Sequence, residues 1–225
     1  MKILSFDIGI KNLAYCVIDG DNLEILDWGI LDLRTGKSCD HITKGSKSCD
    51  KEATSIVDGH YLCTTHKKLA KYKSLKSKRV PKQDNPMLTL GKRLVEVLDS
   101  HDLFLNVDAV LLENQPALKN PTMKSVQMMI YSFFLIKGIA NESSDIKTIV
   151  MINARNKLKA YQGSPISCDI KDKYKRTKYL GIKYCELMIH ANQEIDEKFH
   201  TLFETNKKKD DLADAYLQAI YYMTK

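Results

Sequence analysis

The chain has 225 residues, which is enough for one domain with a hydrophobic core together with a smaller module. Hydrophobic residues make up 44%, as in ordinary globular proteins, and 35 basic against 28 acidic side chains give a net charge of +7, a modest bias towards polyanionic partners. No apolar run is long enough to span a bilayer, and an apolar strand begins at once, so neither a membrane protein nor a secretory or transit peptide is expected. Six cysteines without such a leader indicate an intracellular, reducing compartment, where clustered cysteines bind metal more often than they form disulfides.

The first motif is an aspartate at the end of a buried strand. Residues 3–6 are mostly β-forming and apolar, the run is too short for a helix, and Asp7 follows it directly. Gly9 permits a tight turn, after which a period-two pattern predicts a second strand that ends at a hairpin signal, residues 19–22. A third strand is expected up to residue 31. Because a buried unpaired carboxylate is costly, Asp7 is expected to face a cation, a donor or water; capping of the turn is the alternative role.

Residues 33–85 differ in character, because polar residues dominate and the apolar periodicity is lost. Four candidate metal ligands fall there: Cys39, Cys49, Cys63 and His66. The Cys-x2-His pair at 63–66 suits a tetrahedral zinc ion, and the other two cysteines would complete the four ligands. The nine-residue gap between Cys39 and Cys49 is unusually wide, so two nearby histidines are alternative ligands: His41 and His60. A small polar segment needs such a staple to be ordered, whereas reduced surface thiols are the other interpretation.

A basic run follows the cysteines. Residues 67–82 carry eight lysines and arginines and no acidic residue, with Tyr72 among them. One interpretation is a solvated linker. The other is a DNA-binding arm in which the tyrosine stacks on a base and the basic side chains contact phosphates. The DNA contacts are then expected from Lys71, Lys73, Lys76, Lys78 and Arg79.

Regular structure resumes after the basic run. The periodicity predicts a helix over 86–100, a strand within 106–116, a helix over 123–140, a short strand over 147–152 and a loop region over 153–172. The strand within 106–116 is a continuous apolar run, which is typical of a strand covered on both faces. Glu113 follows that run directly. It is therefore the second acid at a strand end, although by itself this feature favours a solvated glutamate.

Two helices are expected near the end of the sequence. The helix over 173–191 has an apolar stripe that begins at Lys178, whose amine either points at the surface that the helix packs on or reaches to solvent. The helix over 207–223 carries Asp211 and Asp214, which share a face because they are three residues apart. Asp210 is the candidate N-cap, a role that does not explain Asp214.

Together the acids form the candidate site. Carboxylates that converge on one point repel each other, and such clusters persist when divalent cations neutralise them. Oxygen ligands suit Mg²⁺ or Mn²⁺. Two such ions can activate a water and stabilise the leaving oxygen of a phosphodiester, so phosphodiester hydrolysis is the expected chemistry.

Three motifs, FDIGIKN, LLENQP and KKDDLADA, resemble those of the RuvC-type, ribonuclease H-like Holliday junction resolvases of poxviruses and other large DNA viruses, with the yeast mitochondrial resolvases as relatives. The motifs occur in the family order, and the resemblance covers nearly the whole chain except about residues 33–85. It implies an α/β fold with a mixed five-stranded sheet flanked by helices. It also implies two magnesium or manganese ions per active site and a homodimer that cuts four-way DNA by paired symmetric nicks. A viral member would act in the host cytoplasm.

The resemblance also implies roles for single residues. Asp7 would bridge the two metals, Glu113 would bind one of them, and Asp211 with Asp214 would complete the set. The family places a lysine near the scissile phosphate, and Lys178 is the candidate for it here, with Lys175 as the alternative.

The expected catalytic domain comprises residues 1–32 and 86–225, with 33–85 as an inserted zinc-binding and basic module. Two other functions are compatible with parts of the sequence. A non-catalytic, zinc-dependent DNA-binding protein would need only the inserted module. An actin-like or sugar-kinase-like ATPase also begins with strand-Asp-x-Gly, but the sequence lacks a later glycine-rich nucleotide loop.

Overall fold

The computed structural model describes residues 1–43, 45–82 and 84–225, which form two compact units. The larger unit comprises Met1–Leu33 and Gly91–Lys225, and the smaller comprises Arg34–Leu90. The smaller unit thus extends a few residues beyond the expected segment 33–85, into the first turn of helix α2 (Pro86–Asp99). Two residues of that segment, Lys44 and Gln83, lie outside the described residues.

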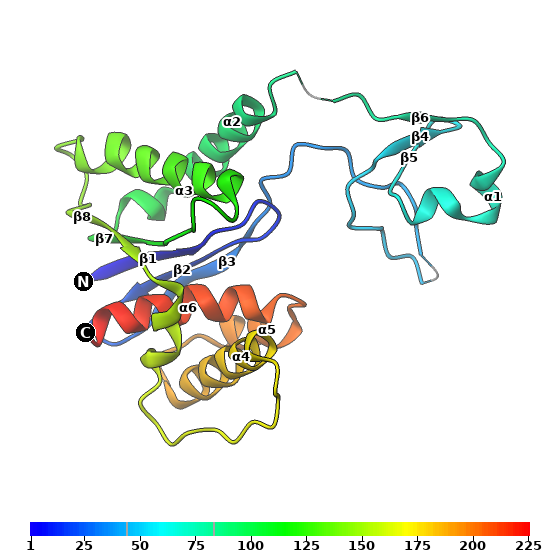
Figure 1. Cartoon of the computed structure of the whole chain (residues 1–225). Coiled ribbons are helices and arrows are strands. Elements are labelled where there is room, and N and C mark those ends of the chain that lie inside the picture. Colours follow the sequence, from blue (N-terminus) through cyan, green and yellow to red (C-terminus); the bar gives the residue numbers. More distant parts are fainter. Residues whose placement is uncertain (44, 83) are drawn as a thin grey trace. The chain divides into compact units, whose positions relative to one another are not determined.

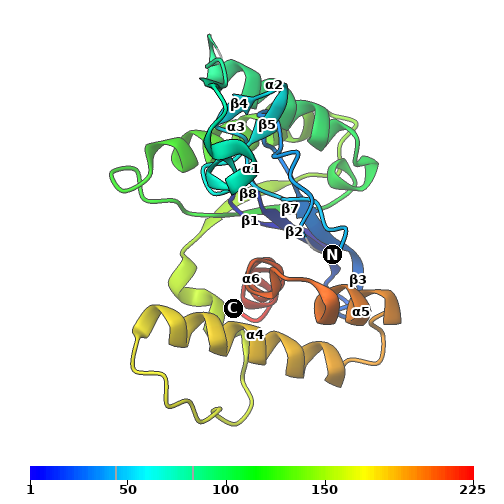
Figure 2. The same ribbon diagram turned by 90° about the vertical axis from the view of Figure 1, so that its right-hand side faces the viewer.

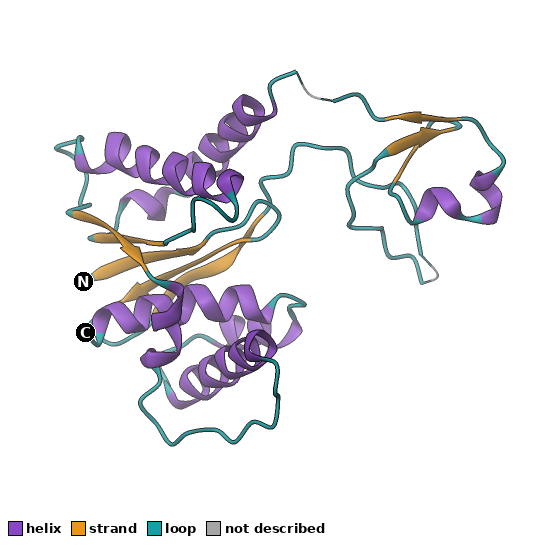
Figure 3. Ribbon diagram, viewed as in Figure 1, coloured by secondary structure: helices purple, strands orange, loops and turns teal. Residues whose placement is uncertain are grey.

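The larger unit is built on a mixed five-stranded sheet, in the order β3-β2-β1-β7-β8 (Figure 1, Figure 3). Its strands are β1 (Lys2–Asp7), β2 (Leu13–Asp19), β3 (Ile25–Leu31), β7 (Ala109–Glu113) and β8 (Thr148–Ile152). The pairs β1–β2 and β2–β3 are antiparallel, whereas β1–β7 and β7–β8 are parallel. This is the sheet that the sequence predicts. The central residues of β1 and β7 are buried because both faces of these strands are covered, and apart from Ser5 they are apolar.

Helices cover both faces of this sheet (Figure 2). They are α2, η2 (Asp102–Leu105), α3 (Pro121–Phe134) with its π-helical continuation η3 (Leu135–Ile139), η4 (Ala154–Ala160), α4 (Lys173–Ala191), α5 (Glu197–Thr205) and α6 (Lys209–Met223). Helix α3 lies on one face, and α4, α5 and α6 lie on the other. Three elements of the larger unit depart from expectation. The 3-10 helix η4 lies inside the segment expected to be a loop, and the short helices η2 and α5 have no counterpart among the expected elements.

Aromatic packing fixes helix α6 to the sheet. The indole N–H of Trp28 on β3 donates to the carbonyl of Leu212 at 3.2 Å, and its ring stacks on Phe203 of α5 at 5.4 Å. Trp28 is only 3% exposed. On the opposite face the ring of Phe6 packs edge-on against Phe104 at 5.5 Å. The first turns of α6 are therefore held against the strand ends, which determines where their acidic side chains lie.

The smaller unit contains more regular structure than its sequence indicates. It contains a three-stranded antiparallel sheet in the order β5-β4-β6. Two short helical turns lie between β5 and β6 in sequence. These elements are β4 (Ser55–Val57), β5 (His60–Leu62), η1 (His66–Lys68), α1 (Ala70–Lys73) and β6 (Ser77–Arg79). Three of the five residues in its buried cluster are cysteines, the others being Val57 and Leu62. So small an apolar core requires an additional stabilising cross-link.

Among the described residues, none of the helices combines the length and the apolar character that a membrane crossing requires.

Candidate functional site

Two acids lie side by side at the carboxyl edge of the sheet. Strands β1 and β7 are parallel neighbours, with Phe6 opposite Leu112, and each strand ends one residue later with an acid, Asp7 or Glu113. Both acidic side chains are largely buried, with exposed fractions of 14% for Asp7 and 16% for Glu113. The carboxyl ends of parallel strands meet at one edge, so the expected proximity of these two residues follows from the topology.

A third acid joins them through a buried lysine. The ammonium of Lys157, on η4, lies 2.9 Å from Asp7 Oδ1, 3.2 Å from Glu113 Oε2 and 3.0 Å from Asp214 Oδ2 of helix α6. Its side chain is 6% exposed. One nitrogen atom of η4 thus contacts the ends of β1 and β7 and the start of α6.

The electrostatics of this group are unbalanced. Burial and the neighbouring Glu113, opposed by Lys157, together raise the pKa of Asp7 to about 7. Burial also raises the pKa of Asp214. Burial by itself lowers the pKa of Lys157, but attraction to Asp7, Asp214 and Glu113 outweighs it, so the net pKa is raised and the amine stays charged. One ammonium among three carboxylates leaves an excess of negative charge.

The other acids of helix α6 lie at its first turn. Burial and the adjacent Asp210 raise the pKa of Asp211 to about 6, and its carboxylate lies 3.6 Å from the amine of Lys208. Asp210 forms an ion pair with Lys178. The residue at the N-cap position is Lys208, and no side chain caps this helix end, so the expected capping role of Asp210 is wrong.

The structure places Lys157, rather than Lys178, among the acids. Lys178 contacts Asp210 instead, and the alternative Lys175 is exposed on α4. Sequence reasoning missed Lys157 because it lies in a 3-10 helix without apolar periodicity. A topological signal was present: η4 follows β8, the third parallel strand, whose carboxyl end lies at the same edge as those of β1 and β7.

The residues at this edge suit a divalent cation. Carboxylate oxygens are hard donors of the kind that Mg²⁺ and Mn²⁺ prefer. Lys157 uses one oxygen of each of the three carboxylates, and it neutralises only part of their charge. The donor set and the excess negative charge therefore fit a metal-binding role for Asp7, Glu113 and Asp214, with Asp211 next to them.

A buried amide on the opposite face supports the segment after Glu113. The side-chain oxygen of Gln127 on α3 accepts from the backbone N–H of Gln115 at 2.9 Å and from Lys124 Nζ at 3.1 Å. Lys124 also donates to the side chain of Asn114. The ENQP motif is thus fixed to helix α3 through side chains.

The smaller unit holds a second candidate site. Ligand atoms of Cys39, Cys49, Cys63 and His66 all lie within 4.8 Å of one another. The Cys39 Sγ to His66 Nδ1 distance is 3.4 Å, close to the roughly 3.6 Å separation of sulfur and nitrogen ligands on a tetrahedral zinc ion. Burial raises the pKa of the Cys63 thiol, but backbone N–H groups of His66 and Thr65 outweigh it, which favours the thiolate. This cluster has the composition and spacing of a metal site.

The two alternative histidine ligands differ in their surroundings. The ring of His41 lies 3.9 Å from that of His66, whereas exposed His60 lies near Tyr72. The basic side chains expected to bind DNA are exposed on or beside α1 and β6, and Lys71 Nζ lies 4.6 Å from the ring of Tyr72. They are Lys71, Lys73, Lys76, Lys78 and Arg79.

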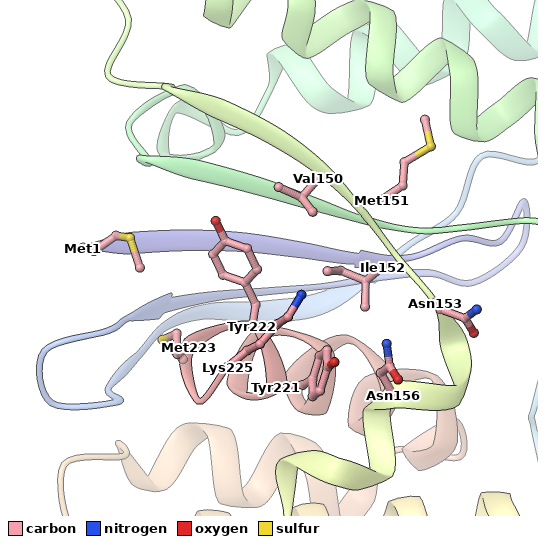
Figure 4. Close-up of a pocket in the computed structure, with 10 residues that line it drawn as sticks. All are labelled: Met1, Val150, Met151, Ile152, Asn153, Asn156, Tyr221, Tyr222, Met223 and Lys225. Carbon is pink, nitrogen blue, oxygen red and sulfur yellow. The ribbon is translucent and has the colours of Figure 1, made fainter.

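In the larger unit, a pocket of about 620 Å³ lies between β8 and the last turns of α6 (Figure 4). Its lining combines apolar side chains with Asn153, Asn156 and the rings of Tyr221 and Tyr222. None of the site acids lines it.

Comparison with known proteins identifies relatives and a shared fold. No protein-family model matches the sequence. An uncharacterized protein of Acanthamoeba polyphaga mimivirus, L451, is 30% identical over 99% of this chain and 74% of its own length. The yeast mitochondrial Holliday junction resolvase Ydc2 has a similar structure, with a TM-score of 0.56, 16% identity and coverage of 98% of this chain and 78% of that one. The fowlpox virus resolvase, solved with Holliday junction DNA, has a TM-score of 0.50, 18% identity and coverage of 100% and 97%.

The identity to L451 extends over nearly all of this chain and three quarters of the relative. The two resolvase structures match 98% and 100% of this chain. The protein therefore belongs to the same family as mimivirus L451, and its fold is the ribonuclease H-like fold of the Holliday junction resolvases.

Proposed function

We propose that this protein is a metal-dependent endonuclease that resolves four-way DNA junctions by paired, symmetric nicks. The observation that carries the proposal is the convergence of Asp7, Glu113 and Asp214 on Lys157 at the carboxyl edge of a resolvase-type sheet. The resolvases with a similar structure provide the substrate class, since one of them was solved with Holliday junction DNA.

The acids would hold the cations. Asp7, Glu113 and Asp214 would hold the Mg²⁺ or Mn²⁺ ions of a two-metal site, and Asp211 would complete the set of ligands. When bound, such ions supply an activated water and stabilise the leaving 3′ oxygen, so that a 5′-phosphate and a 3′-hydroxyl remain. Lys157 would limit repulsion between the acids and would supply a positive charge near the scissile phosphate. Lys178 would hold Asp210 away from the cluster.

Paired nicks require two sites, so we propose a homodimer. An apolar stripe on α3 and its π-helical continuation supports this, because four large side chains there are at least 40% exposed: Met128, Leu135, Ile136 and Ile139. Their spacing places them along one side of the helix. A second copy of the chain would cover this stripe.

The smaller unit would act as an inserted DNA-binding module. Zinc bound by Cys39, Cys49, Cys63 and His66 would staple its small core. The exposed lysines and Arg79 on or beside α1 and β6 would then contact phosphates, with affinity that falls steeply with salt. Selection of the junction would come from DNA shape rather than from base edges.

The test uses a labelled, immobile four-way junction with and without Mg²⁺, comparing the wild type with Asp7→Asn. We expect symmetric paired nicks that need Mg²⁺, loss of cleavage in Asp7→Asn, and retained junction binding by that variant. Binding without any cleavage by the wild type in Mg²⁺ or Mn²⁺ would instead favour a non-catalytic DNA-binding protein. Nucleotide hydrolysis that Asp7→Asn abolishes would favour an ATPase.

A further inference from the structure

Buried polar side chains of the described chain gather around the acids. Five polar or charged residues are almost fully buried, and four of them lie in the larger unit: Ser5, Gln127, Lys157 and Gln218. Lys157 contacts the acids, and Gln127 holds the segment after Glu113. Ser5 and Gln218 form a hydrogen bond with each other near the ends of the strands. Because buried polar groups are costly, their concentration here calls for a role other than packing.

Gln218 joins the two strands that carry Asp7 and Glu113. Its side-chain Nε2 donates to Ser5 Oγ at 3.0 Å and to the Phe6 carbonyl at 3.1 Å, both on β1. The same nitrogen lies 3.5 Å from the Leu111 carbonyl on β7. One buried amide therefore contacts both central strands.

These contacts lie next to the site in sequence as well as in space. Phe6 immediately precedes Asp7, and Leu111 is two residues before Glu113. Gln218 lies one helical turn after Asp214, on the same side of α6. A single side chain thus links the elements that carry the three acids.

Packing alone does not account for a glutamine at this position. Its Oε1 is buried and lacks a hydrogen-bond partner among the described residues. Reversal of the amide would place that oxygen against two carbonyl oxygens, so the orientation with the nitrogen towards the strands is the favourable one. A methionine would fill a similar volume without an unpaired buried oxygen.

We propose that Gln218 is a positioning residue that fixes Asp7 and Glu113 relative to Asp214 for cation binding. This inference rests on the proposed function, because it assigns cations to those acids. Supporting groups around metal ligands typically change metal affinity by about 10- to 100-fold. Gln218 would act in this way through backbone carbonyls rather than through the carboxylates themselves.

The test is Gln218→Met, with Leu217→Met as a matched control on the same helix, since Leu217 is equally buried. Protein purified with zinc is titrated with Mn²⁺ by calorimetry, and thermal unfolding and junction cleavage are measured in parallel. We expect Gln218→Met to unfold near the wild-type temperature, to bind Mn²⁺ about tenfold more weakly and to require more metal for cleavage. Leu217→Met keeps wild-type affinity.

A second variant guards against a folding defect. Gln218→Asn keeps the amide but shortens its reach by one methylene, so weaker Mn²⁺ binding with an intact fold is again expected. Unchanged Mn²⁺ affinity in folded Gln218 variants overturns the positioning role even if the wild type cleaves junctions. Conversely, wild-type protein that binds Mn²⁺ without cleaving DNA overturns the proposed function, while the affinity of the variants still decides the role of Gln218. A wild type that does not bind Mn²⁺ overturns both.

Discussion

The ammonium of Lys157 lies 2.9 Å from the Asp7 carboxylate, although 150 residues separate the two in sequence. This contact joins the end of the first strand to a short 3-10 helix that follows the last strand of the sheet. It places a permanently charged amine where the acids would otherwise repel one another.

The two candidate lysines can be separated by mutation. Lys157→Met should lower the rate of junction cleavage by roughly 100-fold, the usual effect of removing one preorganised charged group from an active site. Lys178→Met should have a small effect, because Lys178 pairs with Asp210 outside the central cluster. Single-turnover rates at saturating Mg²⁺ measure the difference. Equal losses for both variants would contradict the distinct placement of the two lysines.

Removal of the Asp7 charge should stabilise the protein when no divalent cation is added to the acids. The pKa of Asp7 in the folded state is raised to about 7, so the folded state binds a proton more tightly than the unfolded state. Its contribution to the free energy of unfolding is therefore most favourable at low pH, declines as pH rises from about 4 to 7, and stays low above that.

Asp7→Asn removes this dependence. Without added Mg²⁺, the variant should have a higher Tm than the wild type at pH 8. The difference in Tm between the two proteins should be smaller at pH 5. Calorimetric scans of both proteins at the two pH values measure it, and added Mg²⁺ should stabilise only the wild type. A variant with a lower Tm than the wild type at pH 8 would count against an ionisation penalty at Asp7.

The cysteine–histidine cluster should bind one zinc ion per chain. Cys63→Ser should release that zinc and reduce hydrogen-exchange protection within residues 34–90 while protection of the sheet in the larger unit is kept. Cys168→Ser is the control, because Cys168 lies outside the cluster. Metal analysis of purified protein gives the stoichiometry. Wild-type protein without zinc, or a Cys63→Ser variant that retains it, would exclude the site.

The basic residues of the smaller unit should govern the salt dependence of DNA binding. Replacing both Lys71 and Lys73 by glutamine removes two positive charges. The slope of the logarithm of the DNA-binding constant against the logarithm of salt concentration should then become less steep by about 1.8, since each phosphate contact contributes about 0.9. The same double change at exposed Lys37 and Lys47 of that unit is the matched control. Junction binding over a series of salt concentrations measures both slopes. Identical slopes would remove α1 from the DNA-binding surface.

Local sequence patterns predict the sheet well, because its strands are short apolar runs with an acid or a turn at their ends. The order of motifs also indicates that Asp7 and Glu113 lie together. The pattern could not identify Lys157 or the ion pair between Lys178 and Asp210, because both depend on how remote elements pack. Within residues 33–85 the short strands were missed because three-residue strands have too few positions for a periodicity to appear, whereas the ligand set of the metal cluster followed from cysteine and histidine spacing.

The pairing of Phe6 with Leu112 has a consequence for tolerance to insertions and deletions. Side chains on a strand alternate between faces, so loss or gain of a single residue inside β7 would turn Glu113 away from Asp7 while leaving the composition of the strand almost unchanged. A segment of more than fifty residues is accommodated between β3 and α2, but this five-residue strand has no such freedom. Length variation among relatives should therefore be excluded from β1 and β7 and concentrated between Leu33 and Gly91.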